Sequence, residues 1–329
     1  MIYIDNENVT DPQINLALEE YALKNLPVDE TYLLFYTNEP CIIIGKNQNT
    51  HEEINKKFVD ENDIYVVRRL SGGGAVYQDL GNLNFSFLTK DDGDSFSNYA
   101  KFTEPVIEAL RQLGVEAELS GRNDIQVGER KISGNAQYTT KGRMFSHGTL
   151  LVDVEMENIV DSLNVNEEKI RSKGIKSVRA RVANINEFTQ KAITVDELKK
   201  IILAYVFKET DIETYRFTKE QWKEIYALAE ERYKNWDWNY GKSPKFDLKR
   251  SKRFEGAGTI DVRLDVSKGT IQACKIFGDF FGMGDISVVE EKLVGVKYDK
   301  NAIHEALETI DMTYYFGKVS REGFIELIY

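Results

Sequence analysis

Two adjacent arginines followed by three consecutive glycines form the most informative segment of this chain. The run reads Arg68-Arg69-Leu70-Ser71-Gly72-Gly73-Gly74-Ala75-Val76-Tyr77. Three glycines in a row are costly to fix in a helix or a strand, but they let backbone N–H groups approach a ligand with no Cβ atom in the way. Guanidinium groups supply fixed positive charge for phosphate or carboxylate oxygens. The segment predicts an anion-binding loop, and the alternative is an ordinary glycine-rich connection between two strands.

Two further segments carry residues that could do chemistry. Lys131 stands inside an apolar strand, and the residues after it are Ile132 and then Ser133-Gly134-Asn135. It is either a functional cation or an edge-strand lysine that discourages aggregation. His147 lies in a second apolar run, where a histidine taken alone is more often structural than catalytic.

Composition and missing motifs exclude several classes of function. The chain has no G-x-x-x-x-G-K-[ST] motif, and its glycine run fails G-x-G-x-x-G at the last glycine, so any bound nucleotide needs another fold. The formal net charge is -11 and no basic stripe is present, which argues against nucleic acid. No apolar run approaches the roughly 20 residues that cross a bilayer, so no membrane partner is expected. The three histidines are scattered and give no structural zinc spacing.

The two cysteines and the first residues predict where the protein resides. Cys41 and Cys274 are far apart in sequence and each lies in an apolar, strand-like run. This pattern indicates buried thiols in a reducing compartment rather than a disulfide framework. The first five residues have neither a basic region nor an apolar signal core. We expect a cytoplasmic protein.

Local patterns predict helices and strands around these segments. Asp11-Pro12 is a helix start, and Thr194 with Glu197 and Thr218 with Gln221 are capping boxes at the start of two more helices. A further helix is expected over 97–113. Strands are expected over 32–36, 41–44, 64–67, 83–87, 125–127 and 131–133, at 145 and over 150–154.

The composition changes near residue 245. The stretch 235–244 is irregular and rich in turn formers, and 249–253 is a basic run expected to be solvated. Residues 260–266 alternate between apolar and charged, then turn back through 267–269 into an apolar run over 271–277, which predicts a hairpin. One helix is expected over 302–310. We predict two domains, 1–245 and 246–329.

Taken in order, the motifs resemble those of lipoate–protein ligases of the two-domain type, in the biotin/lipoate ligase superfamily. The similarity spans nearly the whole chain. It is carried by the arginine–glycine run and by the segments at 15–20, 45–49, 84–87, 121–124, 131–134, 177–184 and 276–282. The resemblance implies an α+β fold, in which a catalytic domain with a mixed β-sheet flanked by helices is followed by a small C-terminal α/β accessory domain.

The resemblance also implies a reaction in two steps. Lipoate and Mg-ATP first give lipoyl-AMP and pyrophosphate, and a lysine of an acceptor lipoyl domain then displaces AMP. Arg69 and the backbone of Gly74-Ala75-Val76-Tyr77 would hold ATP. Lys131 would be the catalytic cation, contacting both the lipoate carboxyl and the α-phosphate, because a fixed positive charge offsets the repulsion between a carboxylate and a phosphoryl group.

Other roles follow from the same resemblance. Ser71, Gly73, His147 and Lys131 would contact lipoate, and Val76, Tyr77 and Phe35 would be walls for its alkyl chain. Asn123 and Asp124 are candidates for Mg²⁺ or ribose contacts, since a hard cation prefers oxygen ligands. Gln78 stands where relatives often carry histidine, which argues against a histidine acid–base role there. The acceptors would be apo-lipoyl domains of 2-oxoacid dehydrogenase E2 subunits, the glycine-cleavage H protein, or both.

Three alternative interpretations of the function stay open. A lipoyl or octanoyl transferase would use a cysteine nucleophile, but none stands between residues 42 and 273. A biotin ligase would share the architecture, but its glycine–arginine motif differs. A non-catalytic paralogue would be marked by loss of Arg69 or Lys131, and both are present.

Overall fold

The computed structural model describes residues 1–121, 123–164, 181–208, 212–241, 248–267 and 269–329. These residues form two compact units. The larger unit comprises Met1–Ile44, His51–Arg68 and Val76–Asn239, and the smaller unit comprises Gly45–Thr50, Arg69–Ala75 and Tyr240–Tyr329. Arg122 and residues 177–180, which contribute to two of the motifs, lie outside the described residues. So does the domain boundary at 245/246, which stays a prediction.

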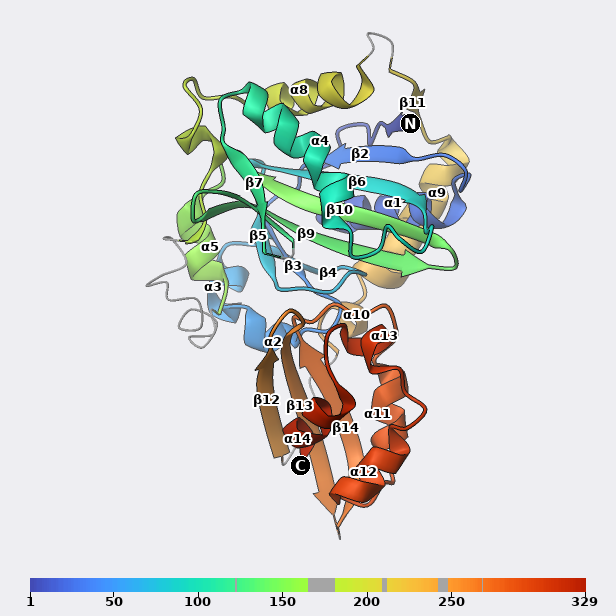
Figure 1. The fold of residues 1–329 in the computed structure, drawn as a ribbon. Coiled ribbons are helices and arrows are strands. Elements are labelled where there is room, and N and C mark those ends of the chain that lie inside the picture. Colours follow the sequence, from blue (N-terminus) through green and yellow to red (C-terminus); the bar gives the residue numbers. More distant parts are fainter. Residues whose placement is uncertain (122, 165–180, 209–211, 242–247, 268) are drawn as a thin grey trace. The chain divides into compact units, whose positions relative to one another are not determined.

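The larger unit is built on an eight-stranded mixed sheet (Figure 1). Its strand order is β11-β1-β2-β6-β10-β9-β8-β7. β1 pairs in parallel with β11 and β2, and every other pair in this sheet is antiparallel. The bounds are β1 Ile2–Ile4, β2 Tyr32–Tyr36, β6 Asn82–Lys90, β7 Ala117–Ser120, β8 Asp124–Val127, β9 Arg130–Thr140, β10 Arg143–Leu151 and β11 Thr214–Tyr215.

Helices cover both faces of this sheet, as Figure 1 shows. α4 (Tyr99–Gln112) and α8 (Val195–Phe207) pack together on one face over a core of apolar side chains. α1 (Pro12–Asn25) contacts β6 and β10 and packs beside α9 (Lys219–Leu228). The predicted α+β class with a mixed sheet between helices is confirmed.

The predicted helix starts are confirmed in atomic detail. The Asp11 carboxylate accepts hydrogen bonds from the backbone N–H groups of Gln13 and Ile14 at the start of α1. Both capping boxes are formed, at Thr194 for α8 and at Thr218 for α9. Each satisfies N–H groups that have no partner within the helix.

A second, three-stranded sheet in the larger unit has the order β4-β3-β5. β3 (Cys41–Ile44) pairs in parallel with β4 (Tyr65–Arg68) and antiparallel with β5 (Val76–Gln78). The strand predicted over 64–67 therefore runs one residue later, and its last residue is the first arginine of the motif. Among the described residues, the remaining short helices of this part are α2 Thr50–Glu53, α3 Lys56–Glu61, α5 Met156–Ser162, η1 Ile185–Glu187, the π-helical segment η2 Ala229–Tyr233 and α10 Trp236–Asn239.

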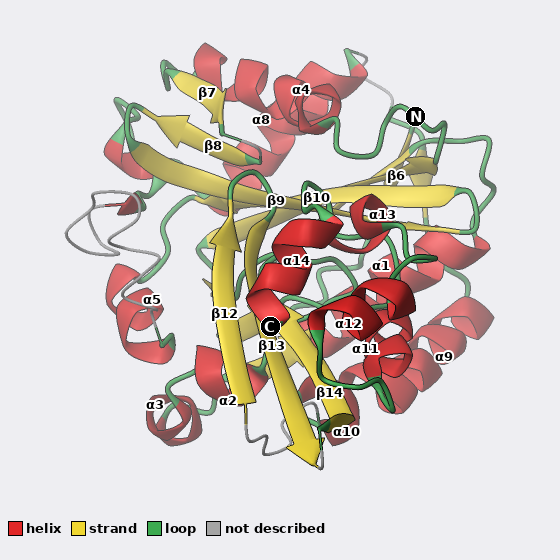
Figure 2. Ribbon diagram, turned by 60° about the horizontal axis from the view of Figure 1, so that its bottom comes forward, coloured by secondary structure: helices red, strands yellow, loops and turns green. Residues whose placement is uncertain are grey.

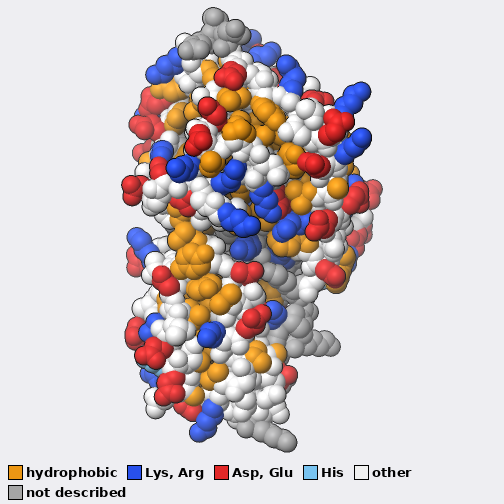
Figure 3. All heavy atoms as spheres, turned by 90° about the vertical axis from the view of Figure 1, so that its right-hand side faces the viewer, with side chains coloured by type: hydrophobic (Ala, Val, Ile, Leu, Met, Phe, Trp, Pro, Cys, Tyr) orange, Lys and Arg blue, Asp and Glu red, His pale blue; other side chains and the backbone are white. Residues whose placement is uncertain are grey.

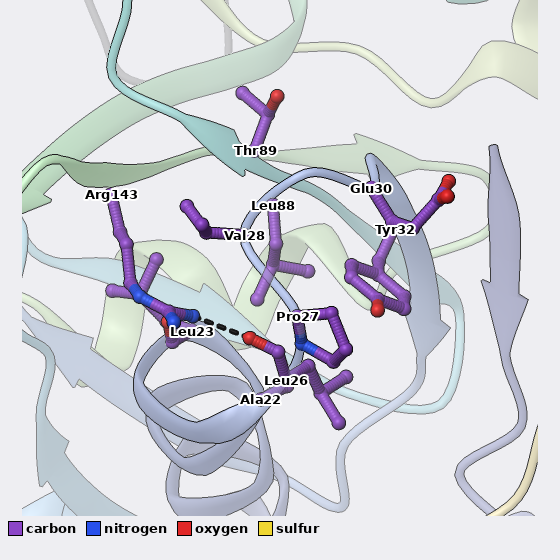
Figure 4. A pocket seen from close by; sticks show the side chains of 10 residues that line it. All are labelled: Ala22, Leu23, Leu26, Pro27, Val28, Glu30, Tyr32, Leu88, Thr89 and Arg143. Atoms are coloured by element: carbon purple, nitrogen blue, oxygen red, sulfur yellow. Dashed lines mark hydrogen bonds between the residues drawn. The ribbon is translucent and has the colours of Figure 1, made fainter.

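Arg143 fixes the carboxyl end of α1 against the large sheet. From β10 its guanidinium donates to the backbone carbonyls of Leu23 and Leu26, 3.1 and 2.5 Å away. Carbonyls at a helix end lack intrahelical donors, and a cation there is favourable. Figure 4 shows this side chain on the wall of a small pocket, which we therefore regard as structural.

The smaller unit contains an antiparallel sheet of β12 (Leu248–Phe254), β13 (Gly258–Ser267) and β14 (Thr270–Gly278). Figure 2 shows helices packed against one face of this sheet, where they share an apolar core with it. The predicted hairpin is confirmed as β13 and β14. The basic run at 249–253 is exposed, as expected, but it forms edge strand β12.

The expectation of one C-terminal helix is wrong. The described part of this unit has four, namely α11 Ser287–Leu293, α12 Lys300–Ala306, α13 Met312–Phe316 and α14 Arg321–Ile328. Each is only five to eight residues long. So few turns give too little periodicity to identify a helix from sequence.

Charge is distributed rather than concentrated on the face drawn in Figure 3, where acidic and basic side chains are interspersed. Among the described residues, no helix is both long enough and apolar enough to cross a membrane.

Candidate active site

The glycine loop connects β4 to β5 and is part of the smaller unit. Arg69 is buried at its start, and its guanidinium folds back over the loop. Nε donates to Ser71 Oγ (3.0 Å), and Nη2 donates to the carbonyls of Gly72 (2.6 Å) and Gly74 (2.9 Å). Arg69 thus fixes the curvature of the loop, in addition to bringing positive charge into it.

The three glycines of the loop are needed for different physical reasons. Gly73 has φ +93°, and a Cβ atom there would lie 2.8 Å from Phe281 Cζ and 2.9 Å from Arg69 Nη2. A Cβ at Gly72 would lie 2.6 Å from the Phe280 carbonyl oxygen. Both glycines are therefore required by packing within the smaller unit. Only Gly74 faces open space, and with Ala75 it is partly exposed.

Val76 and Tyr77 open β5 in the larger unit. Val76 is partly exposed, whereas Tyr77 is buried and its hydroxyl accepts a hydrogen bond from Asn158 Nδ2 at 3.1 Å. Burial raises the pKa of Tyr77 to about 12, so the phenol stays neutral at physiological pH. The partly exposed residues of this region accordingly run from Gly74 to Val76.

Lys131 and Asp124 form an ion pair between two neighbouring strands. Lys131 Nζ lies 2.8 Å from Asp124 Oδ1, and Arg181 lies 3.6 Å from Asp124 Oδ2. Both members of the first pair retain some exposure, at 22% for Lys131 and 14% for Asp124. The two cations around a single carboxylate leave this site with net positive charge, which is suited to an anionic ligand.

The backbone around Lys131 is irregular. Between β8 and β9 the pairing shifts, so that Ile125 faces Ser133 but Gln126 faces Lys131. This places a β-bulge at Ile132, the kind of feature that redirects a neighbouring side chain. The Lys131 carbonyl also accepts from the Ala183 N–H at 2.9 Å. Gly134 lies directly beneath the lysine, since a Cβ atom there would be 2.7 Å from Nζ.

Asn123 and Asp124 differ in what they could offer a cation. The Asn123 amide nitrogen donates to the Asn135 carbonyl, and the Asn135 amide nitrogen donates back to the Asn123 carbonyl. This reciprocal pair leaves the Asn123 side-chain oxygen as its available ligand atom. Together with the Asp124 carboxylate it gives two oxygen donors. Mg²⁺ is commonly bound by one or two protein oxygens plus substrate phosphates. The Asn123 oxygen meets that requirement, whereas the Asp124 carboxylate is already paired with Lys131 and Arg181. No cluster of three or more acidic, His or Cys metal ligands occurs among the described residues.

His147 lies on β10 and pairs with Glu19, a carboxylate that was not among the predicted site residues. Its Nδ1 is 3.0 Å from Glu19 Oε1, and both residues are buried. The imidazole also packs 4.6 Å from the Phe145 ring. Glu19 belongs to the 15–20 motif, so its position was visible in the sequence. Its partner was not, because 128 residues separate the two.

The predicted site residues therefore fall into two groups. The larger unit holds one group, in which Lys131, Asp124 and Asn123 adjoin on β8 and β9, His147 lies on the next strand, and Val76 and Tyr77 lie on the second sheet. The smaller unit holds Arg69, Ser71, Gly73, Gly74 and Ala75. Phe35 is fully buried in the apolar core, and its place in the wall of an alkyl pocket stays a prediction.

Comparisons with known proteins identify the family. Residues 11–207 match the lipoyl protein ligase A/B catalytic domain, and residues 243–328 match the bacterial lipoate protein ligase C-terminus. The chain is 59% identical over 332 residues to lipoate-protein ligase LplJ of Bacillus subtilis, with 100% of both chains covered. This chain belongs to the lipoate–protein ligase family.

Solved structures of ligases agree with that assignment. Plasmodium falciparum LipL1 in complex with lipoate matches with a TM-score of 0.79 and 28% identity, covering 99% of this chain and 97% of that one. A lipoate-protein ligase A bound with ATP matches with a TM-score of 0.62 and 29% identity, covering 70% and 94%. A bipartite ligase from Thermoplasma acidophilum, studied with its E2 lipoyl domain, matches with a TM-score of 0.64 and 31% identity, covering 75% and 98%.

In this ligase, Gln78 belongs to a buried chain of side-chain amides. Asn38 Nδ2 donates to Gln78 Oε1 at 2.7 Å, and Gln78 Nε2 donates to Asn84 Oδ1 at 2.9 Å. Asn38 in turn accepts from Asn15 Nδ2 at 2.9 Å. Both polar atoms of Gln78 are thus engaged in holding α1, β5 and β6 together. The residue has a structural use here that involves no proton transfer.

Neither cysteine of this ligase is suited to act as a nucleophile. Cys41 and Cys274 are free thiols and both are buried. Burial in apolar surroundings is the main cause that raises the pKa of each thiol well above its usual value. Both are therefore neutral thiols at physiological pH, which disfavours the thioester mechanism of the transferases.

Proposed function

We propose that this ligase joins lipoate to acceptor proteins through an acyl-adenylate. A lipoate carboxylate oxygen attacks the α-phosphorus of ATP, the bond to the bridging oxygen breaks, and pyrophosphate leaves. The ε-amine of an acceptor lysine then attacks the acyl carbon, loses a proton, and displaces AMP to form an amide. Family membership and the relatives bound to lipoate and to ATP support this chemistry.

The Lys131–Asp124 pair is the observation that carries the proposal. Lys131 would lie between the lipoate carboxyl and the α-phosphate and would reduce the repulsion between these two anions. Asp124 would hold the ammonium group in place, because an ion pair at 2.8 Å restricts the flexible lysine. Gly134 would support this placement by leaving room beneath the lysine.

The other site residues would bind and orient the substrates. Arg69 and the Gly74–Tyr77 backbone would hold ATP, with the partly exposed segment from Gly74 to Val76 nearest the phosphates. Ser71, Gly73 and the His147–Glu19 pair would contact lipoate. Asn123 and Asp124 would bind Mg²⁺, which supplies charge neutralisation to the phosphates when bound.

We propose apo-lipoyl domains as the acceptors, from 2-oxoacid dehydrogenase E2 subunits, the glycine-cleavage H protein, or both. The bipartite relative studied with its E2 lipoyl domain supports the first class. We also propose a cytoplasmic location, because both cysteines are free thiols.

The test is to incubate the purified protein with ATP, Mg²⁺, lipoate and a panel of apo-lipoyl domains, and to determine intact masses. A lipoyl mass increment that requires ATP is the expected result, and the modified member identifies the acceptor. Transfer from a lipoylated donor without ATP would instead support a transferase. No increment and no lipoate-dependent pyrophosphate release would favour a non-catalytic paralogue.

A further inference from the structure

The first arginine of the motif is bound to a distant part of the chain. Arg68 is fully buried at the end of β4, and its Nε and Nη2 donate to the backbone carbonyls of Trp238 (2.9 Å) and Asn239 (3.3 Å). The Arg68 N–H donates to Asn239 Oδ1 at 2.9 Å. In return, Trp238 Nε1 donates to the Arg68 carbonyl at 2.8 Å. We call these four hydrogen bonds the Arg68 clasp.

The clasp lies where the chain leaves the larger unit. Arg68 is the last residue before the glycine loop, and Asn239 is the last residue before the C-terminal segment. Both residues belong to the larger unit, and they are separated by 171 positions. The clasp therefore joins the start of the glycine loop to the start of the C-terminal segment.

The clasp is itself anchored within the larger unit. Asn239 Nδ2 donates to the Tyr233 carbonyl at 2.7 Å, and the buried Tyr233 hydroxyl donates to Glu20 on α1 at 2.7 Å. Arg232 stacks on the Trp238 ring at 4.8 Å and forms an ion pair with Glu20 at 3.3 Å. Arg232 and Tyr233 belong to π-helical η2, a rare form that is frequent at functional sites. The carbonyls to which Arg68 binds are consequently fixed in position.

A fully buried guanidinium is costly unless its donors are satisfied. Packing of β4 does not require such a residue, since β4 otherwise contributes valines to the interior. The buried cation instead holds the backbone of Trp238 and Asn239 in a defined position. The two nitrogens of its rigid fork bind two successive carbonyls at once, which a lysine cannot do.

We propose that Arg68 is a positioning residue for the glycine loop, acting through the Trp238–Asn239 pair. Because Arg69 follows Arg68 directly, the clasp fixes the backbone from which the loop starts. This inference rests on the proposed function of the loop. It implies that loosening the clasp weakens ATP use in adenylate formation but spares transfer from lipoyl-AMP supplied to the enzyme.

Trp238→Phe tests the proposal because it removes the indole N–H and keeps an aromatic ring for Arg232. The matched control is Trp222→Phe on α9, which removes the hydrogen bond from the Trp222 indole to Glu7 (2.9 Å). We expect Trp238→Phe to raise the KM for ATP about tenfold in lipoate-dependent pyrophosphate release, as the loss of one buried hydrogen bond suggests. Transfer from added lipoyl-AMP should stay within about twofold, and the control should change neither step.

Hydrogen exchange gives a readout that needs no activity. The Lys46 N–H donates to the Ser71 carbonyl of the loop at 2.9 Å. Its exchange should be faster in Trp238→Phe and unchanged in Trp222→Phe. If the wild-type protein releases no pyrophosphate but Lys46 exchange is faster in Trp238→Phe than in wild type, the proposed function is refuted and the clasp is supported.

Arg68→Lys is the second variant, since it retains the buried charge but loses the fork. We expect the same selective loss in the ATP step, larger than that of Trp238→Phe. Equal losses in both steps, or an unchanged ATP step with unchanged Lys46 exchange, would overturn the proposal. The clasp would then serve only the stability of the larger unit.

Discussion

Gly134 and Lys131 are matched to one another in this ligase. The missing side chain of Gly134 leaves room for the lysine ammonium, which lies where a Cβ atom at position 134 would be 2.7 Å away. In that position Nζ is 2.8 Å from Asp124 Oδ1. Three residues on two strands thus determine where a single positive charge stands.

Lys131→Ala should abolish lipoyl-AMP formation and leave the fold intact. The substitution removes the cation placed between two anions, and the loss of such a charge typically lowers rates by a factor of about 100 to 1,000. The measurement is lipoate-dependent pyrophosphate release. The control is Arg130→Ala on the same strand, which breaks an exposed pair with Glu187 at 2.6 Å. Retention of more than about one per cent of wild-type activity by Lys131→Ala would refute the catalytic role.

Gly134→Ala should reduce activity with little effect on stability. The new methyl group would meet the end of a flexible side chain rather than backbone, so the lysine can move aside at small cost. Once displaced, it loses its short contact with Asp124. We expect a fall in kcat of about tenfold and a melting temperature within about 3 °C of wild type. A large loss of melting temperature would show that Gly134 is needed for packing instead.

Gly73→Ala and Gly74→Ala form a matched pair within the glycine loop. At Gly73 the backbone is left-handed and a Cβ atom would collide with Phe281, whereas Gly74 faces open space. Gly73→Ala should destabilise the protein by about 2 kcal/mol, and Gly74→Ala by less than about 0.5 kcal/mol. Chemical denaturation measures both. Equal destabilisation would contradict the different packing that we assign to these two positions.

The thiols should be unreactive in the native protein. Because burial raises the pKa values of both Cys41 and Cys274, neither forms appreciable thiolate at pH 7 to 8. Iodoacetamide should label neither residue until denaturant is added, and ligase activity should survive the treatment. Mass spectrometry before and after unfolding checks this. Rapid native labelling accompanied by loss of activity would restore a cysteine mechanism.

Helix starts and several candidate site residues of this protein could be predicted from local sequence. The capping residues Asp11, Thr194 and Thr218 mark their helices because the signal lies within four residues. The arginine–glycine run and Lys131 stood out because their types are unusual in apolar surroundings. The mixed arrangement of strands, by contrast, was inferred from the family resemblance, since local pattern says only that helices and strands occur together.

Only the tertiary structure decided which residues far apart along the chain become partners. Sequence could not assign Arg68 to Asn239 or Glu19 to His147, because those pairs are separated by 171 and 128 positions. Nor could it distinguish glycines that permit packing, such as Gly73, from one that faces open space, such as Gly74. Residue type and spacing determine which chemistry is available. The fold determines which groups are brought within bonding distance, because only the packed chain fixes side chains from separate strands and helices in one place.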